Sequence, residues 1–372
     1  MKILILPDSY KGSLTSTQVC DAMERGIKTA IPSAETVKLP LSDGGEGFAA
    51  CVKAMTGGRE ISVEVTYPMG EPGPASYLIT PDGQTAVIEM AAACGLTLIP
   101  EEERNPINVS TYGLGQLIAH ALSQKVKRLI IGLGGSATND GGAGMLAALG
   151  ARFTDANGRE ISPTPQGLAH LAHADFGKMP DLSQIEMIAA CDVTNPLCGA
   201  TGASYIFGPQ KGASPEDVAR LDGILARYAR ITGMNPDLPG AGAAGGTGAA
   251  LLNILGARFQ SGIDLMLELC VFKKLAQDAD AVFTGEGRTD SQSADGKAVS
   301  GVAKAAKEMG LPVICISGAI DNQSVAPLYE QGVTAMFSIA DGPMDLNDAM
   351  KNAARLLEDQ SRHVAAVLNT RL

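Results

Sequence analysis

Short apolar runs alternate with amphipathic segments near the amino terminus of the chain. The run KILIL (residues 2–6) is followed by a segment, Val19 to Ile27, whose apolar residues recur at four-residue intervals. Thr15 and Gln18 stand at the spacing of a capping box, which predicts that a helix begins there. A second apolar run (residues 35–41) and a second helical segment follow. This strand–helix order predicts a parallel sheet with helices on both faces.

The same alternation returns at the carboxyl end. The runs DAVFTGEG, PVICISGAID and AMFSIADG have the pattern of buried strands, helical segments separate them, and a final helix is expected around residues 345–368. The middle differs, because EISVEVTYP, ASYLITPDG and QTAVIEMAA follow one another with Pro and Gly between them, which favours antiparallel strands. We therefore predict an α/β protein: a discontinuous Rossmann-like domain, residues 1–60 and 275–372, with an inserted mixed α/β domain, residues 61–274.

Composition narrows the classes of function. The 372 residues carry a formal net charge of −11, which argues against binding to nucleic acid or to an anionic membrane. The seven cysteines form no C-x-x-C pair. The chain contains neither an 18-residue apolar stretch nor a signal-peptide pattern, so a cytoplasmic location is expected. The sequence leaves open whether the protein is a monomer or a homodimer.

Glycines and acidic residues recur where predicted strands end. Ligands of open α/β sheets bind at the carboxyl ends of strands, so these loops contain the candidate site residues. The candidates after the successive strands are Asp8, Lys11, Asp43, Gly134, Gly135, Ser136, Thr138, Asn139, Asp140, Asp192, Gly285, Glu286, Gly287, Arg288 and Asp290. Glycine lets backbone amides approach phosphate oxygens, and the carboxylates suggest a bridging divalent cation. The combination indicates binding of a Mg²⁺–nucleotide complex and phosphoryl transfer.

Other interpretations of these loops remain open at this point. The run GLGGSATNDGGAG (residues 132–144) is also consistent with a structural turn, and Asp140 and Asp43 are each consistent with simple helix caps. No G-x-x-x-x-G-K-[ST] motif is present, which excludes an ordinary P-loop protein. No clean G-x-G-x-x-G follows the first strand, which disfavours a nicotinamide-dependent dehydrogenase.

Eight ordered blocks give the chain a specific resemblance to the bacterial class I glycerate kinases. The blocks are LPDSYKGSL, PLSDGGEGF, NPINVSTYGLG, GLGGSATNDGGAGML, CDVTNPLCG, GPQKGAS, PGAGAAGGTGAAL and TGEGRTDSQSADGK. Together with their flanking chain they cover essentially the whole sequence. Tyr10 stands where phenylalanine is expected in many relatives, and the aromatic ring is kept.

The resemblance implies ATP- and Mg²⁺-dependent phosphorylation of D-glycerate, usually to 2-phosphoglycerate, in the cleft between two unlike α/β domains. Glycerate offers a carboxylate and two hydroxyls, so the site needs a cation, a base and a metal on the phosphates. Asp192 is the favoured base and Asp8 its rival, while Lys11 and Arg288 are the preferred charge clamps. The expected metal ligands are Asp43, Glu286 and Asp290.

The expected cofactor-binding residues are in two glycine-rich loops: Gly134, Gly135, Ser136, Thr138 and Asn139 in one, Gly285 and Gly287 in the other. Two alternatives accompany this hypothesis. One is a kinase of another small hydroxy acid, or a kinase that gives 3-phosphoglycerate. The other is a metabolite-sensing protein without turnover.

Overall fold

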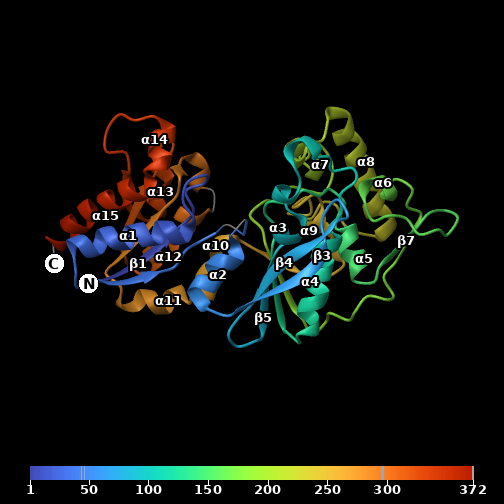
Figure 1. Cartoon of the computed structure of the whole chain (residues 1–372), viewed down its shortest axis with the longest axis horizontal. Coiled ribbons are helices and arrows are strands. Elements are labelled where there is room, and N and C mark those ends of the chain that lie inside the picture. Colours follow the sequence, from blue (N-terminus) through green and yellow to red (C-terminus); the bar gives the residue numbers. More distant parts are fainter. Residues whose placement is uncertain (43, 46, 295–296, 371–372) are drawn as a thin grey trace. The chain divides into compact units, whose positions relative to one another are not determined.

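The chain divides into two compact units. The computed structural model describes residues 1–42, 44–45, 47–294 and 297–370. The first unit comprises Met1–Asp43, Ala50–Gly57 and Ser261–Leu372, and the second comprises Gly44–Ala49 and Gly58–Gln260. Both ends of the chain thus belong to the first unit, and the second unit is inserted into it (Figure 1).

The first unit contains the terminal segments of the chain. Its elements are β1 (Lys2–Pro7), α1 (Ser16–Ala30), β2 (Glu35–Lys38), most of α2 (Phe48–Thr56), α10 (Gly262–Leu269), α11 (Phe272–Leu275), β11 (Ala281–Gly285), β12 (Arg288–Thr289), α12 (Ala298–Glu308), β13 (Val313–Ser317), β14 (Ala319–Ile320), α13 (Ala326–Gln331), β15 (Val333–Ser338), α14 (Leu346–Lys351) and α15 (Ala353–Asn369).

Five strands of this unit form a parallel sheet in the order β15-β13-β11-β1-β2. Every neighbouring pair in it is parallel. Numbered along the chain, the order is 2-1-3-4-5, which is a doubly wound arrangement that reverses its direction between β1 and β11. The predicted parallel sheet is confirmed, and its switch point lies at the carboxyl ends of these two strands.

Helices cover both faces of the five-stranded sheet. On one face α1 packs along α15, as Figure 1 shows, and Val19, Met23 and Ile27 of α1 are fully buried there. Burying an aliphatic side chain of this size stabilises a fold by about 1.5–3 kcal/mol. The predicted capping box is present, with Thr15 accepting from the Gln18 amide. Helix α12 contacts β11, β13 and β1, and α10 packs against α12.

The packing of α10 explains why residues 261–274 belong to the first unit, although the sequence pattern placed them in the middle region. Gly301 of α12 leaves room for Ile263 of α10: a Cβ at residue 301 would lie 2.5 Å from Cγ1 of Ile263. The expected final helix is also divided, because α14 ends and α15 begins on either side of Asn352.

The second unit contains the middle of the chain. Its elements are β3 (Arg59–Thr66), β4 (Pro72–Ile79), β5 (Thr85–Glu89), α3 (Met90–Cys94), α4 (Tyr112–Ser123), β6 (Arg128–Gly132), α5 (Ala143–Ala148), β7 (Arg152–Thr154), α6 (Pro165–Leu168), β8 (His173–Asp175), β9 (Glu186–Ala190), α7 (Ala203–Phe207), α8 (Pro215–Thr232), α9 (Thr247–Asn253) and β10 (Arg258–Gln260).

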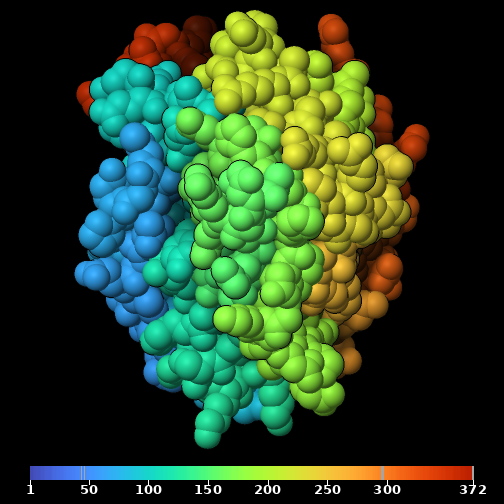
Figure 2. Space-filling view, turned by 90° about the vertical axis from the view of Figure 1, so that its right-hand side faces the viewer, coloured from blue at the N-terminus to red at the C-terminus, as the bar shows by residue number. Residues whose placement is uncertain are grey.

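A six-stranded mixed sheet organises this unit, in the order β10-β9-β6-β5-β4-β3. The hairpin of β3 and β4 and the pair of β4 and β5 are antiparallel, as the sequence predicted, and the other pairs are parallel. One hydrophobic core joins the sheet to α4, α5, α8 and α9. Figure 2 shows the resulting surface, on which segments far apart in the sequence, coloured light blue, green and yellow, lie side by side.

None of the helices in the described part of the chain is both long and apolar enough to cross a membrane.

Candidate active site

The carboxyl ends of β1 and β11 bring two predicted loops together. The Asp8 amide donates to the Gly285 carbonyl at 2.9 Å, which continues the pairing of the two strands by one residue. The carboxylate of Asp8 accepts from the Ser9 amide at 2.6 Å, and Lys11 is exposed. Asp8 and Lys11 therefore lie at the switch point of the sheet, beside the loop that begins at Gly285.

The space at Gly285 admits no side chain. A Cβ at this residue would lie 1.7 Å from the carbonyl oxygen of Ile316 on the neighbouring strand β13. At Gly287 a Cβ would lie 3.3 Å from the backbone nitrogen of Lys11, so the two loops run close together. The Glu286 amide faces the Ser317 hydroxyl at 3.4 Å, whereas within the described residues nothing accepts from the Gly287 amide. A backbone donor is thus available at Gly287.

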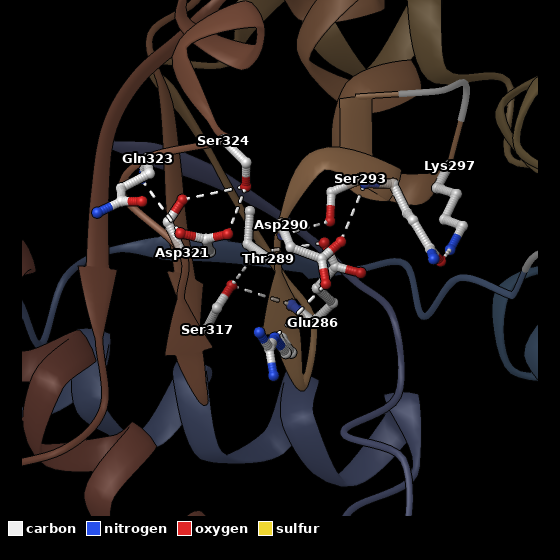
Figure 3. Close-up of polar contacts among 11 residues, drawn as sticks. Glu286, Thr289, Asp290, Ser293, Lys297, Ser317, Asp321, Gln323 and Ser324 are labelled. Carbon is white, nitrogen blue, oxygen red and sulfur yellow. Dashed lines mark hydrogen bonds and ion pairs between the residues drawn. The ribbon is translucent and has the colours of Figure 1, made fainter.

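Glu286 is held by a closed ring of hydrogen bonds (Figure 3). Its amide donates to Ser317 Oγ at 3.4 Å, Ser317 Oγ lies 2.7 Å from Thr289 Oγ1, and Thr289 Oγ1 donates to Glu286 Oε1 at 3.2 Å. Because Ser317 accepts from the amide and Thr289 donates to the carboxylate, the Ser317 proton points to Thr289. Both hydroxyl residues are fully buried. The ring fixes the carboxylate relative to its own backbone.

Asp290 and Arg288 follow Glu286 in the same loop. The Asp290 amide donates to Ser293 Oγ at 3.0 Å, and its Oδ1 accepts from the Gln292 amide at 3.0 Å. Arg288 Nε lies 3.5 Å from Asp290 Oδ2, but the Arg288 side chain is 69% exposed. An exposed pair of this kind contributes little to stability, so the guanidinium is available for an anionic ligand.

The two carboxylates of this loop suit a magnesium ion. Burial raises the pKa of Glu286, hydrogen bonds from Ser293 and Thr289 and the charge of Lys297 oppose that shift, and the Asp290 charge adds to it. A bound cation would offset both the burial and the repulsion. Mg²⁺ commonly uses one or two carboxylates together with phosphate oxygens and water.

The remaining acidic residues near this loop bear on how such an ion would be coordinated. Asp43, the third predicted ligand, lies outside the described residues. Within the ranges that the structure describes, no group of three acidic, histidine or cysteine side chains is placed to hold a metal ion by itself. Glu286 and Asp290 therefore fit an ion that shares its coordination with a substrate.

The second candidate loop follows β6 in the second unit. The Gly134 amide donates to the Gly44 carbonyl at 3.3 Å, and Gly135, with φ of 72°, adopts the left-handed conformation that favours glycine. The Gly135 carbonyl accepts from the Leu96 amide, and the Ala137 amide donates to the Cys94 carbonyl. In the described part of the chain nothing accepts from the amides of Gly135 and Ser136. Two donors are thus free at the tip of the loop.

The residues after the tip turn inward. Thr138, Asn139 and Asp140 are fully buried. Asn139 Nδ2 donates to Ser204 Oγ at 2.9 Å, while Thr138 Oγ1 and Asn139 Oδ1 are buried without a partner. The structure therefore places the predicted cofactor-binding residues Thr138 and Asn139 behind the tip.

Asp140 caps the backbone of its own loop. Its carboxylate accepts from the Thr111 amide and hydroxyl, both at 2.8 Å, and from the amides of Gly142 at 3.0 Å and Gly144 at 3.1 Å. Burial raises its pKa, and these hydrogen bonds oppose the shift. The contacts with Gly142 and Gly144 lie at the start of α5, as expected for a cap at the beginning of a helix, while those with Thr111 tie the loop to the residue before α4.

Asp192 lies in the segment after the strand that neighbours β6. It follows β9, whose Ala190 pairs with Gly132 of β6, and the Leu133 amide donates to the Ala190 carbonyl at 3.4 Å. The Asp192 side chain is exposed. Asp192 and the tip of the loop therefore lie at the carboxyl ends of adjacent strands.

Lys211 is a buried residue for which the sequence suggested no role. Only 3% of it is exposed, and its ammonium donates to Ser136 Oγ at 2.8 Å and to the Thr138 carbonyl at 2.7 Å. Lys211 belongs to the block GPQKGAS of the family resemblance, but its contact with Ser136 joins residues 75 positions apart. No local pattern in the sequence predicts it.

The predicted residues thus fall into two groups. In the first unit Asp8, Lys11, Gly285, Glu286, Gly287, Arg288 and Asp290 gather at the ends of β1 and β11. In the second unit Gly134, Gly135, Ser136 and Asp192 lie at the ends of β6 and β9. In each unit the strand-end loops thus combine charged side chains with backbone amides, which is typical of α/β enzymes that act on anionic substrates.

Comparison with known proteins identifies the family. The family model described as "Glycerate kinase family" matches residues 3–369. A glycerate kinase of Bacillus subtilis is 48% identical over 372 residues, 98% of this chain and 97% of the relative. The glycerate 2-kinase of Escherichia coli is 46% identical over 374 residues, with 99% and 98% covered.

A solved structure agrees with this relationship. A crystal structure from Salmonella typhimurium LT2, whose protein carries the provisional name glycerate kinase 2, has a TM-score of 0.87 and 46% identity, with 100% of this chain and 98% of that chain covered. The chain belongs to the glycerate kinase family. The resemblance seen in the sequence is confirmed, and with it the predicted class of enzyme, a kinase.

Proposed function

We propose that the protein phosphorylates D-glycerate with ATP and Mg²⁺ and releases 2-phosphoglycerate and ADP. The observation that carries the proposal is the full-length similarity, at 46% identity, to a relative named glycerate 2-kinase. The gathering of Asp8, Lys11, Glu286, Arg288 and Asp290 at one switch point supports it, because phosphoryl transfer needs cations and carboxylates in the same place.

In the proposed reaction a hydroxyl oxygen of glycerate attacks the γ-phosphorus of ATP. The bond from that phosphorus to the bridging oxygen breaks, ADP leaves with the electron pair, and the hydroxyl proton passes to a carboxylate. Asp192 is our preferred base and Asp8 its rival. Asp192 is exposed at the end of a strand, and Asp8 lies at the switch point of the other sheet.

Cationic and backbone groups have the remaining roles in this proposal. Lys11 and Arg288 neutralise the glycerate carboxylate or the transferred phosphoryl group. The free amides of Gly135, Ser136 and Gly287 donate to anionic oxygens. Glu286 and Asp290 would hold Mg²⁺, which would neutralise phosphate charge.

A turnover assay tests the proposal. The protein would be incubated with ATP, Mg²⁺ and D-glycerate, and the product resolved by phosphorus NMR. A signal for 2-phosphoglycerate is expected. A signal for 3-phosphoglycerate would still show glycerate kinase activity, but with transfer to the other hydroxyl. Turnover only with another hydroxy acid would change the acceptor, and folded protein that turns over no acceptor would contradict the proposal.

A further inference from the structure

We propose that Lys211 is a positioning residue that prepares the tip of the glycine-rich loop, Gly134–Ser136, to bind an anionic group of a substrate. The inference rests on the proposed kinase function, since it concerns how this loop would hold a nucleotide phosphate or the glycerate carboxylate. Both groups present anionic oxygens. The experiment below distinguishes the two sources.

Lys211 fixes the shape of the loop from behind. Its Nζ donates to Ser136 Oγ at 2.8 Å and to the Thr138 carbonyl at 2.7 Å, so it bridges two residues on either side of Ala137. The segment that carries Lys211 is itself held, because the Lys211 amide donates to the Gly208 carbonyl at 2.9 Å. The backbone between Ser136 and Thr138 is therefore tied to a fixed point.

The same contact directs the Ser136 hydroxyl. An ammonium group can only donate, so Ser136 Oγ accepts from Lys211 and its own proton must point elsewhere. Within the described residues nothing accepts that proton, and nothing accepts the amides of Gly135 and Ser136. Three donors without a described acceptor are therefore located on two successive residues of the tip. Successive backbone amides of a turn are a common way to bind an anion.

The charge of Lys211 is not cancelled by a contact. In the part of the chain that the structure describes, no carboxylate lies within ion-pair distance of its Nζ. Asp140 is the acidic group that acts on it, from a distance, and its oxygens are taken by Thr111, Gly142 and Gly144. A buried positive charge therefore lies directly behind Ser136, where it favours an anion at the tip. Burial lowers the pKa of Lys211 to about 7, and Asp140 opposes the shift.

The test measures binding without turnover. Titration calorimetry would follow ADP with Mg²⁺ and, separately, D-glycerate, binding to the full chain, to Lys211→Met and to the control Lys178→Met, a surface lysine of the same unit. We expect Lys211→Met to raise the Kd of one ligand about tenfold or more, because a charge-assisted hydrogen-bonding arrangement is lost. The affected ligand identifies the anion. An unchanged Kd for both ligands would overturn the proposal, as would wild-type protein that binds neither.

Ser136→Ala provides the second arm, because it removes the directed hydroxyl and leaves Lys211 in place. We expect it to weaken the same ligand severalfold, and we expect the double variant to lose no more than Lys211→Met alone. Additive losses would show that the two residues act separately and would contradict the inference. If Lys211→Met does not fold, an unchanged Kd in Ser136→Ala refutes the proposal by itself.

Affinity as a function of pH separates positioning by charge from a merely structural role. Wild-type affinity for the affected ligand should fall as the pH rises through 7 to 9 and Lys211 loses its proton, and the fall should be absent in Lys211→Met. Parallel pH profiles in the two proteins would contradict the inference. The proposed function fails on different evidence, namely the absence of turnover in the wild type while ADP or D-glycerate still binds.

Discussion

Two strand-end loops of this protein both contain glycines and acidic residues, but they place the acidic side chains differently. The loop after β11 keeps its carboxylates, Glu286 and Asp290, only partly buried, whereas the loop after β6 buries Asp140 completely. In the loop after β11, the Thr289 and Ser317 hydroxyls orient the Glu286 carboxylate, which remains accessible to a ligand. In the loop after β6, the Asp140 carboxylate accepts hydrogen bonds from backbone amides and is not accessible. The same pairing of glycines with an acidic residue can therefore give either an accessible carboxylate or a buried structural one.

The largest expected effect tests which unit supplies the base. Asp192→Asn should lower kcat about 10³-fold with ADP affinity kept, because an amide cannot take the hydroxyl proton and general bases contribute about 10²–10⁴-fold. Steady-state kinetics and calorimetry would measure both quantities. Asp8→Asn is the matched comparison, and a larger loss of kcat there would move the base to the first unit.

The next effect concerns the buried acid of the second unit. Asp140→Ala leaves four donors without an acceptor, so we expect a loss of about 3–5 kcal/mol in the free energy of unfolding. Urea unfolding followed by circular dichroism would measure it. A loss below about 1 kcal/mol with a loss of turnover would instead give Asp140 a chemical role.

Glu286→Gln should impair turnover and metal binding rather than stability. We expect turnover to fall about 10²-fold and Mn²⁺, used as a paramagnetic substitute, to bind more weakly, since one carboxylate of the pair is lost. Burial raises the pKa of Glu286, so the folded state binds its proton more tightly than the unfolded chain. Its contribution to stability is therefore lost as the pH rises above its ordinary value of 4.5.

The glutamine variant should accordingly be as stable as the wild type at pH 7, or more stable. Glu308→Gln is the control, because Glu308 is an exposed acid of the same unit. Normal Mn²⁺ binding in Glu286→Gln would remove Glu286 from the metal site.

In the second unit, the buried Lys211 should make stability depend on pH. The folded pKa of Lys211 is about 7 and the ordinary value is 10.5, so between these values the unfolded chain binds more protons and stability rises with pH. From pH 7 to 9 the wild type should gain up to about 2 kcal/mol from this residue. Lys211→Met should lack that gain, and equal gains in both proteins would show that Lys211 titrates normally.

Thr289→Val has the smallest expected effect. The change keeps the shape of the side chain and breaks the ring that holds Glu286, so we expect the Mg²⁺ requirement to rise severalfold, about 1 kcal/mol, at nearly constant kcat. Kinetics at varied Mg²⁺ would measure it. Ser338→Ala is a matched control, since Ser338 bonds to the Gly318 carbonyl and does not belong to the ring.

The strands and helices could largely be predicted from local patterns. The capping box at Thr15 and Gln18 and the antiparallel strands of the middle region are both present. These features depend on neighbouring residues, which a sequence displays directly. The strand predicted over residues 35–41 ends at Lys38, shortly before Pro40, which has no amide proton.

The site was predicted less completely, because its decisive contacts join distant residues. The ring at Glu286 needs Ser317 from another strand, and the buried charge behind Ser136 comes from Lys211. The pattern placed Thr138 and Asn139 beside Ser136, yet it does not show that the chain turns inward after the tip. Burial of a polar residue is a property of the whole fold, so the local sequence does not reveal it.

The insertion of one unit into the other also determines the order in which the strands can pair during translation. Strand β1 leaves the ribosome well before its neighbour β11, which begins only at Ala281. At roughly 5–20 residues per second, β1 waits about 15–55 seconds for that neighbour. Nearly all of the inserted unit is contiguous, so it can fold during this delay, and the five-stranded sheet closes last. Strand β1 is thus synthesised long before β11, its partner in the sheet.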